Sequence, residues 1–95
     1  MYYVYWIQSE DKKNYIGYTS NLENRLAAHN SGSNKSTRGK QWRIVYYEAF
    51  LSEKDARTRE QKLKHSGHAR YGLNSRIHNS LEQFDGGGSS DPKPW

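Results

Sequence analysis

An unbroken run of aromatic and β-branched residues, reading YYVYWI from Tyr2 to Ile7, constrains the fold of this chain more than any other feature. Residues of these types favour strands, because their flat or branched side chains pack well on a pleated surface. No polar position interrupts the run, so we predict a strand over residues 2–7 that is buried on both faces. Alternation along this strand places Tyr3, Tyr5 and Ile7 together on one face.

Cap and turn residues predict where helices begin and end in the rest of the chain. Ser20 and Glu23 have the spacing of a capping box, which predicts a helix starting near Asn21. Gly32 is the expected left-handed residue that ends this helix. Ser52 is the expected cap of a second helix over 53–65, which Gly67 would end.

The order of the predicted elements indicates the fold class. Strands are expected over 2–7, 15–19 and 42–51, and helices over 21–30, 53–65 and 69–84. In the third strand, Trp42, Ile44 and Tyr46 are expected to share one face. The order β-β-α-β-α-α predicts an α+β fold in which a small sheet is flanked by helices.

The composition limits how such a fold can be stabilised. Hydrophobic residues make up 33% of the 95, below the roughly 45–50% of ordinary soluble domains. The chain has 8 Tyr and 3 Trp, whose large side chains can build a core once they are packed. The length fits one domain, which we place over residues 1–82, followed by a flexible tail rich in Gly, Ser and Pro over 83–95.

Several classes of protein are excluded by what the sequence lacks. The chain has no cysteine, which rules out disulfides, thiolate metal sites and cysteine nucleophiles. No apolar run approaches the length of a membrane span, about 18 residues or more, and the N-terminus lacks the pattern of a secretory signal peptide. We therefore expect a cytoplasmic protein without membrane contact.

Positive charge is concentrated in two segments. The 15 Lys and Arg outnumber the 10 Asp and Glu, which gives a formal net charge of +5. The cations gather in residues 35–43 and 54–76. A small basic domain favours a polyanionic partner, and nucleic acid is the commonest polyanion. The alternative is an ordinary solvated surface.

Glu60 is the first candidate for chemistry. It falls on the apolar stripe of the helix predicted over 53–65, together with Ala56 and Leu63. A carboxylate that faces inward is unusual unless it is paired or binds a metal. The alternative reading is an ion pair with a cation of the same helix, for which the choices are Arg57, Arg59 and Lys64.

Two further pairs could act on a phosphate. Arg25 and His29 are four residues apart and therefore neighbours on a helix face, where a cation and a proton carrier would suit a phosphate oxygen. Tyr5 and Tyr15 would stand side by side if the first two strands form a hairpin. The alternatives are a solvated helix face for the first pair and aromatic core packing for the second.

The order and spacing of these residues resemble one known family. Tyr3-Val4-Tyr5 is followed by Tyr15-Ile16-Gly17, then by the other three candidates, Arg25, His29 and Glu60. This pattern is similar to that of the GIY-YIG endonucleases, above all the small stand-alone members, which resemble the N-terminal nuclease domain of the excision-repair incision subunit. The resemblance covers residues 1–81 and is supported by segments 35–39 and 56–64. The first motif departs from the family pattern, reading Tyr-Val-Tyr where the family has Gly-Ile-Tyr.

The resemblance implies a structure and a site. It implies a three-stranded antiparallel sheet, and one Mg²⁺, with Mn²⁺ as the alternative ion, held by Glu60 and water. Tyr15 would take a proton from the attacking water, while Tyr5 positions the water or the phosphate. Arg25 would stabilise charge on the phosphoryl oxygens, and His29 would assist. Some members have a further Asn after the metal-binding helix, for which Asn74 is the nearest residue here, without a firm assignment.

The resulting hypothesis is a metal-dependent endonuclease that nicks DNA, either structure-selectively or without specificity. The residues expected to hold the nucleic acid are Gly17, where the strand passes close to Tyr5 and the substrate, and the cations Lys35, Arg38, Lys40, Arg57, Lys64 and Arg70. The sequence leaves the substrate open: branched or damaged DNA, as met in DNA repair, is one candidate and RNA is another. The protein is expected to be a monomer.

Two alternatives belong to other classes. The first is a nucleic-acid-binding module that uses the same basic surface without catalysis. The second is an interaction protein whose acidic, Gly-rich tail mimics nucleic acid and occupies the groove.

Overall fold

The computed structural model describes residues 1–82, so the tail predicted over 83–95 lies outside the described residues. The elements in chain order are β1 (Tyr2–Ser9), β2 (Asn14–Thr19), α1 (Leu22–Asn30), β3 (Trp42–Phe50), α2 (Glu53–His65), α3 (Gly67–Arg76) and α4 (His78–Glu82). None of the helices within residues 1–82 has the length and apolar character needed to cross a membrane.

The three strands form one antiparallel sheet in the order β2-β1-β3, which confirms the predicted α+β fold. β1 is the central strand, and its residues from Val4 to Ile7 are buried, as the aromatic run predicts, whereas Tyr2 and Tyr3 at the start of the run are only partly buried. In the hairpin, Tyr5 pairs with Gly17 and Ile7 pairs with Tyr15. Tyr5 and Tyr15 are therefore diagonal neighbours on one face of the sheet rather than a direct pair.

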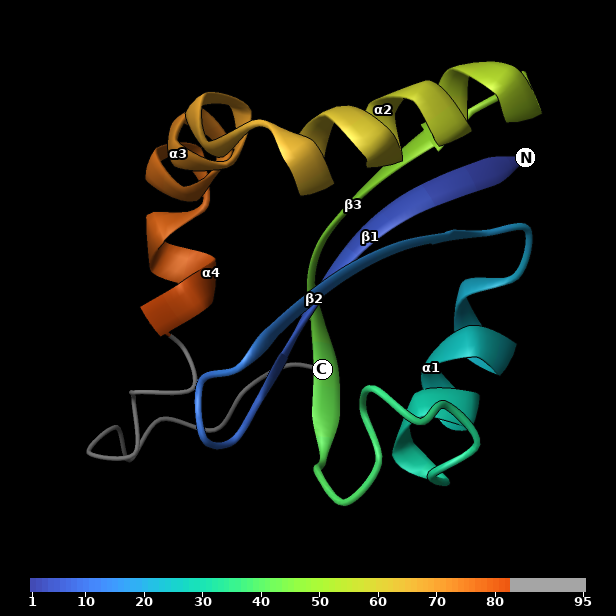
Figure 1. Ribbon diagram of the computed structural model, residues 1–95, viewed down its shortest axis with the longest axis vertical. Coiled ribbons are helices and arrows are strands. Elements are labelled where there is room, and N and C mark those ends of the chain that lie inside the picture. Colours follow the sequence, from blue (N-terminus) through green and yellow to red (C-terminus); the bar gives the residue numbers. More distant parts are fainter. Residues whose placement is uncertain (83–95) are drawn as a thin grey trace.

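Helices cover both faces of the sheet. Figure 1 shows α1 on one side and α2, α3 and α4 on the other. The core on the α2 side is formed by the buried residues Val4, Trp6, Ile16, Ala56, Leu63, Leu73 and Ile77. The core on the α1 side is formed by Tyr5, Ile7 and Trp42, with partly buried Tyr15, Leu22, Leu26 and Ile44 packed against them. Large aromatic side chains lie in both cores, as the low aliphatic content requires.

A bulge in β3 corrects the predicted faces of that strand. Trp6 pairs with Tyr46, but the next residue of β1, Ile7, pairs with Ile44, so Val45 is inserted between the two pairs. An inserted residue reverses the alternation of side chains along a strand. Ile44 consequently packs with Trp42 on the α1 side, whereas Tyr46 packs on the α2 side, and the three residues predicted to share a face are divided.

The start of α1 differs from the prediction by one residue, and its end agrees. Asn21, not Ser20, is the N-cap, and its side chain accepts a hydrogen bond from the Asn24 amide at 3.0 Å. Asn caps a helix as well as Ser does, so the later start costs nothing. At the other end Gly32 has φ +84°. Its amide and that of Ser33 donate to the carbonyls of His29 and Ala28, the pattern of a Schellman motif.

The last predicted helix is divided into two. α2 has the predicted bounds and cap, but Ser66 both ends α2 and caps α3, so Gly67 begins a helix rather than ending one. The segment predicted as one helix over 69–84 leaves helical geometry at Ile77, which separates α3 from α4. Ile77 is buried, and the break lets it enter the α2-side core together with Leu73.

Gly17 provides a stability test of the close approach between β1 and β2. A Cβ built on Gly17 would lie 2.7 Å from Tyr5 Cζ and closer still to Tyr5 Oη, and 3.1 Å from Tyr15 Cε1. Because both rings are packed in place, Gly17→Ala is expected to lower the free energy of unfolding by about 1–3 kcal/mol. Chemical denaturation followed by circular dichroism measures the change.

Gly72→Ala is the matched control for that substitution. Gly72 is exposed within α3, and an added Cβ there would meet nothing within 4 Å. Alanine is the better helix former, so this variant should gain about 0.5–1 kcal/mol. Equal stability of wild type and Gly17→Ala would contradict the packing argument.

Candidate active site

The Tyr5 hydroxyl is the centre of a buried hydrogen-bond network. It lies 2.8 Å from His29 Nε2 and accepts a hydrogen bond from Arg25 Nε at 3.3 Å. Tyr5 comes from the central strand and is 2% exposed, while Arg25 and His29 come from one face of α1, as their spacing predicts. The hairpin leaves room for this hydroxyl because Gly17 has no side chain.

The network continues from His29 into the loop between α1 and β3. His29 Nδ1 lies 2.8 Å from Thr37 Oγ1, and the Thr37 hydroxyl donates to the Asn34 carbonyl at 3.4 Å. With that proton used, Thr37 accepts from Nδ1–H, which leaves Nε2 to accept the Tyr5 hydroxyl proton. A buried bond from Trp42 Nε1 to the Thr37 carbonyl at 2.8 Å holds the loop in place.

Thr37 is a site residue that no motif in the sequence marks. It lies within the segment 35–39 that supports the family resemblance, but the resemblance implies no role for its side chain. A lone Thr in a polar, basic loop has no periodicity that marks it as buried, although its side chain is fully buried here. Its position is fixed by hydrogen bonds with His29 near the end of α1, with Asn34 in the loop and with Trp42 at the start of β3.

Tyr15 stands beside this network at the edge of the sheet. Its ring centroid is 6.4 Å from that of Tyr5 and 4.8 Å from that of His29. Tyr15 is partly buried, so it is more accessible than Tyr5. From the other face, Lys64 of α2 reaches its ring, with Nζ 5.6 Å from the centroid. The fold therefore brings the two predicted tyrosines close to each other and to Arg25 and His29.

Burial and charge set the protonation states of the network. Burial raises the pKa of Tyr5 above its ordinary value, and the hydrogen bond and charge of Arg25 offset part of that rise. The hydrogen bond with Tyr5 raises the pKa of Arg25, so this guanidinium stays charged. Burial, and then the positive charge of Arg25, lower the pKa of His29. His29 is therefore neutral in the folded protein, and its complete burial suits it to holding Tyr5 in position.

Glu60 faces the sheet from α2, with 13% of its side chain exposed. Its carboxylate is paired with Lys64 Nζ at 3.1 Å, which is one of the three ion pairs that the sequence allows. Arg59, another of those choices, instead makes a bidentate pair with Glu48. The carboxylate also contributes to the raised pKa of Tyr5, after burial, which places its charge near the tyrosines.

Glu60 fits the role of a single protein ligand for a divalent cation. Its carboxylate already lies beside a positive charge, the Lys64 ammonium. Within the described residues there is no group of three or more His, Cys, Asp or Glu that could hold a metal. Mg²⁺ often binds through one or two carboxylates, with water and substrate phosphate as its other ligands, so one carboxylate meets its needs.

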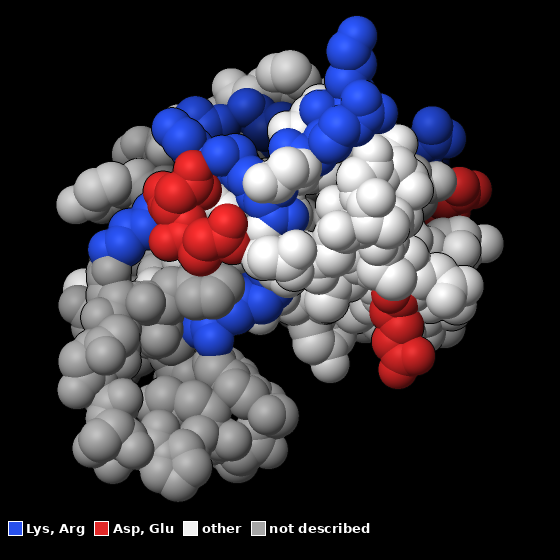
Figure 2. Space-filling model, turned by 90° about the horizontal axis from the view of Figure 1, so that it is seen from below, with Lys and Arg blue, Asp and Glu red and all other residues white. Residues whose placement is uncertain are grey.

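The predicted nucleic-acid-binding cations fall into two groups. Lys35, Arg38 and Lys40 lie in the loop between α1 and β3, where Lys40 pairs with Asp11 at 2.7 Å and Arg38 donates to the Gly32 carbonyl. Figure 2, which looks at the end carrying this loop, shows Lys and Arg gathered across one part of the view beside a group of acids.

The other group comes from α2 and α3. Arg57 lies over the Tyr18 ring at 5.5 Å, and Lys64 borders Tyr15 as described above. Arg70 donates to the Leu63 and Lys64 carbonyls at the end of α2, so part of its hydrogen bonding serves to cap that helix. Asn74 lines a pocket with Trp6 and Asn14 rather than facing the tyrosines.

The buried, neutral His29 predicts a pH-dependent stability. Its pKa is lowered in the folded state, so the unfolded chain binds the proton first as the pH falls. Stability is therefore full above about pH 6.5, the ordinary pKa of histidine, and decreases as the pH falls from there towards the folded pKa. Denaturant titrations between pH 7 and pH 5, above the range of ordinary carboxyl groups, would measure the decrease.

Two histidine variants separate this effect from general protonation. His29→Gln should flatten the dependence in that range, whatever its cost to stability at pH 7. His65→Gln, an exposed change in α2, should leave the dependence as it is in the wild type. A dependence that persists in His29→Gln would count against a neutral, buried imidazole.

Comparison with known proteins identifies the family. Residues 1–74 match the family model described as the GIY-YIG catalytic domain. A UPF0213 protein of Clostridium perfringens is 42% identical over 66 residues, covering 67% of this chain and 71% of the relative. One from Staphylococcus haemolyticus is 40% identical over 65 residues, covering 66% of this chain and 79% of the relative.

A solved structure agrees with these matches. The solution NMR structure of a UPF0213 protein from Bacillus halodurans is similar with a TM-score of 0.54 and 31% identity, covering 97% of this chain and 100% of that one. The match over residues 1–74 spans every member of the tyrosine, arginine, histidine and glutamate cluster. The chain belongs to the GIY-YIG family, whose catalytic domain is of the nuclease type.

Proposed function

We propose that this protein is a metal-dependent endonuclease that nicks DNA by attack of an activated water on a phosphodiester. The observation that carries the proposal is the gathering of Tyr5, Tyr15, Arg25 and Glu60 at the β2 edge, where groups from both faces of the sheet meet. A guanidinium, a phenol and a carboxylate at one place can bind a phosphate, accept a proton and hold a cation.

Arg25 is assigned to the phosphoryl oxygens. Its Nε donates to Tyr5, and a guanidinium has further N–H donors in a fixed plane. This plane suits the bidentate binding of a phosphate, and the bond to Tyr5 orients it beforehand. Stabilisation of charge that develops on the phosphoryl oxygens is the expected result.

Tyr15 is assigned as the group that takes the proton of the attacking water. It is more accessible than Tyr5, whose hydroxyl is engaged with His29 and Arg25 and whose pKa is raised by burial. A phenol is a weak acid with an ordinary pKa of about 10, and nearby positive charge favours the ionised form of such a group. Arg25 interacts with Tyr15, and Lys64 lies over its ring.

Glu60 would hold the divalent cation, Mg²⁺ or Mn²⁺. When bound there, such an ion supplies a Lewis acid for the phosphoryl oxygens and lowers the pKa of bound water. His29 is assigned as a positioning residue, because it is buried behind Tyr5 and orients that hydroxyl.

Nicking of supercoiled plasmid tests the proposal. Wild type should nick with Mg²⁺ and stop with EDTA. Glu60→Gln removes the ligand charge and should lower the rate about hundredfold or more. Arg25→Lys keeps the charge but not the planar fork, and a loss of about 10²–10³-fold is expected. Glu53→Gln, which removes another carboxylate of α2 that bonds Tyr18, should keep activity.

The outcomes separate the enzyme from its alternative. Equal nicking by wild type and Glu60→Gln would mean that the cleavage comes from a contaminant, and the enzyme proposal would fail. DNA binding without cleavage in either protein would favour the non-catalytic module. The same assay with branched DNA, flapped DNA and RNA determines which nucleic acid is preferred.

Salt dependence tests the assignment of the cations. If the loop and α2 cations bind phosphates, the logarithm of the affinity should fall linearly with the logarithm of salt concentration, by about 0.9 per phosphate contacted. Lys35→Ala should reduce the slope by about one, without changing which DNA is preferred. Thr58→Ala, an exposed change in α2 that removes no charge, should leave it unchanged. Binding that is insensitive to salt would overturn this assignment.

A further inference from the structure

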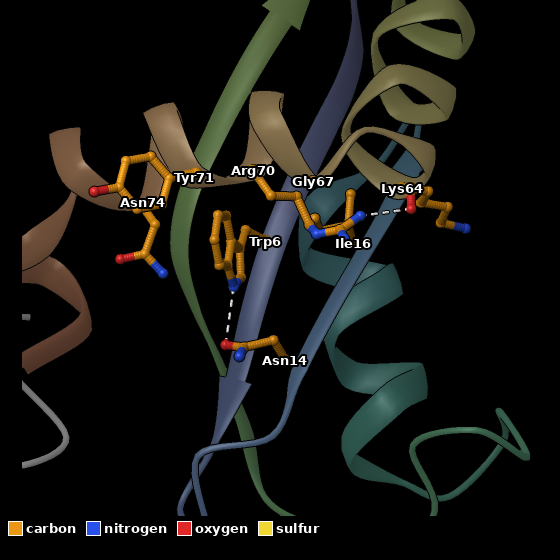
Figure 3. Close-up of a pocket in the computed structure, with 8 residues that line it drawn as sticks. All are labelled: Trp6, Asn14, Ile16, Lys64, Gly67, Arg70, Tyr71 and Asn74. Atoms are coloured by element: carbon orange, nitrogen blue, oxygen red, sulfur yellow. Dashed lines mark hydrogen bonds between the residues drawn. The ribbon is translucent and has the colours of Figure 1, made fainter.

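A pocket of about 710 Å³ lies between α3 and the sheet, on the opposite side from Tyr5. Figure 3 shows Tyr71 and Asn74 extending from α3 on one side of it, with Trp6 of β1 behind. Ile16 adds to the apolar floor, and Asn14 closes one end. The pocket combines a flat aromatic surface with two amide side chains, a set that no role assigned above uses.

The direction of the Asn14 amide is fixed by its neighbours. Trp6 Nε1 donates to Asn14 Oδ1 at 3.0 Å, and Gln8 Nε2 donates to the same atom at 3.2 Å. An indole N–H can only donate, so this atom must be the oxygen. The Asn14 amino group, with two N–H donors, is consequently left at the end of the pocket, where Figure 3 shows it beside the bond to Trp6.

Tyr71 is an aromatic residue that the fold does not bury. It is 78% exposed on α3, whereas Leu73 and Ile77 supply the buried contacts of this segment. An exposed ring above an apolar floor, with amide donors and acceptors beside it, matches the needs of a nucleobase. A base is flat and presents donors and acceptors along one edge.

Lys64 connects this pocket to the candidate active site. It lines the pocket, while its ammonium lies 3.1 Å from the Glu60 carboxylate and 5.6 Å from the Tyr15 ring centroid. Arg70 adds a second cation at the same border. A polynucleotide with a phosphate at the Glu60 site would therefore have a neighbouring nucleotide within reach of the pocket, between positive side chains.

We propose that this pocket binds one unstacked nucleobase of the nucleic acid whose phosphate occupies the site at Glu60. The inference rests on the proposed function for its substrate class, and it adds a preference for nucleic acid with an unpaired nucleotide next to the cleaved bond. A base in a regular duplex is paired and stacked, so it cannot enter the pocket without being extruded. A bulge or a junction already has free bases.

Equilibrium binding in EDTA tests the proposal without cleavage. The probes are one DNA duplex with a single bulged nucleotide, the same duplex with an abasic residue as the bulge, and the fully paired duplex. The two bulged duplexes share backbone shape and charge and differ only in the base. Wild type should bind the bulged base about tenfold tighter than the abasic bulge, the scale of one base stacked on an aromatic ring.

Matched variants tie the difference to the pocket. Asn74→Trp should fill the pocket and abolish the preference, while Ser75→Trp places the same side chain at the next position of α3, outside the pocket lining, and should keep it. Tyr71→Ala removes only the stacking ring and should reduce the preference, with Tyr47→Ala, another exposed tyrosine, as its control. Circular dichroism and thermal melting confirm that each variant is folded.

Each outcome has one meaning for the pocket. Equal binding of the two bulged duplexes, or a preference that survives in folded Asn74→Trp, would overturn the inference even if the protein nicks DNA. A preference lost only in the pocket variants would support it even if no cleavage is found. The last probe is a deoxynucleoside monophosphate, used as a competitor of the bulged duplex. Micromolar binding of the monophosphate that does not displace the bulged duplex would mean that the two occupy different sites, and it would overturn the assignment of the pocket to a nucleobase of the nucleic acid.

Discussion

The Tyr5 hydroxyl is the contact on which both the packing and the candidate chemistry depend. It joins the central strand to α1 through Arg25 and His29, and through His29 to the loop that contains Thr37. These segments are far apart in the sequence, so each bond fixes tertiary structure rather than local structure. The hydroxyl can occupy this place only because Gly17 leaves the space open on the paired strand. A buried polar network is stable only when its members have partners, and each member of this one has them.

That network also explains why a chain so poor in aliphatic residues can place functional groups accurately. Tyr5 contributes its ring to the α1-side core and its hydroxyl to the site, so the same residue packs and positions. His29 is held neutral by burial and by the charge of Arg25. It can therefore accept a hydrogen bond from the Tyr5 hydroxyl without adding a charge to the interior. Core packing and a place in the candidate site are therefore compatible for Tyr5, because its ring serves the first and its hydroxyl the second.

Local patterns predicted most of the fold, and long-range contacts account for the differences. The aromatic run, the caps of Ser52 and Gly32 and the order of strands and helices along the chain followed from neighbouring residues, and they agree with the structure. The bulge at Val45 has no sequence pattern of its own, because it arises where β3 must match β1. The break at Ile77 likewise depends on the core it enters. Site residues were predictable where a motif spaces them, as with Arg25 and His29, whereas the role of Thr37 depends on a partner eight residues away in another element.

The order of the strands allows side chains from both faces of the sheet to meet in one candidate site. Tyr5, Arg25 and His29 belong to the α1 side, whereas Glu60 and Lys64 come from α2 on the other side. Lys64 reaches the Tyr15 ring because β2 is a short edge strand within residues 1–82, with no described strand beyond it. If β1, the long central strand, carried Tyr15, neighbouring strands would separate the two groups. The same edge brings Lys64 to the border of the pocket at Trp6, so α2 connects the candidate active site with that pocket.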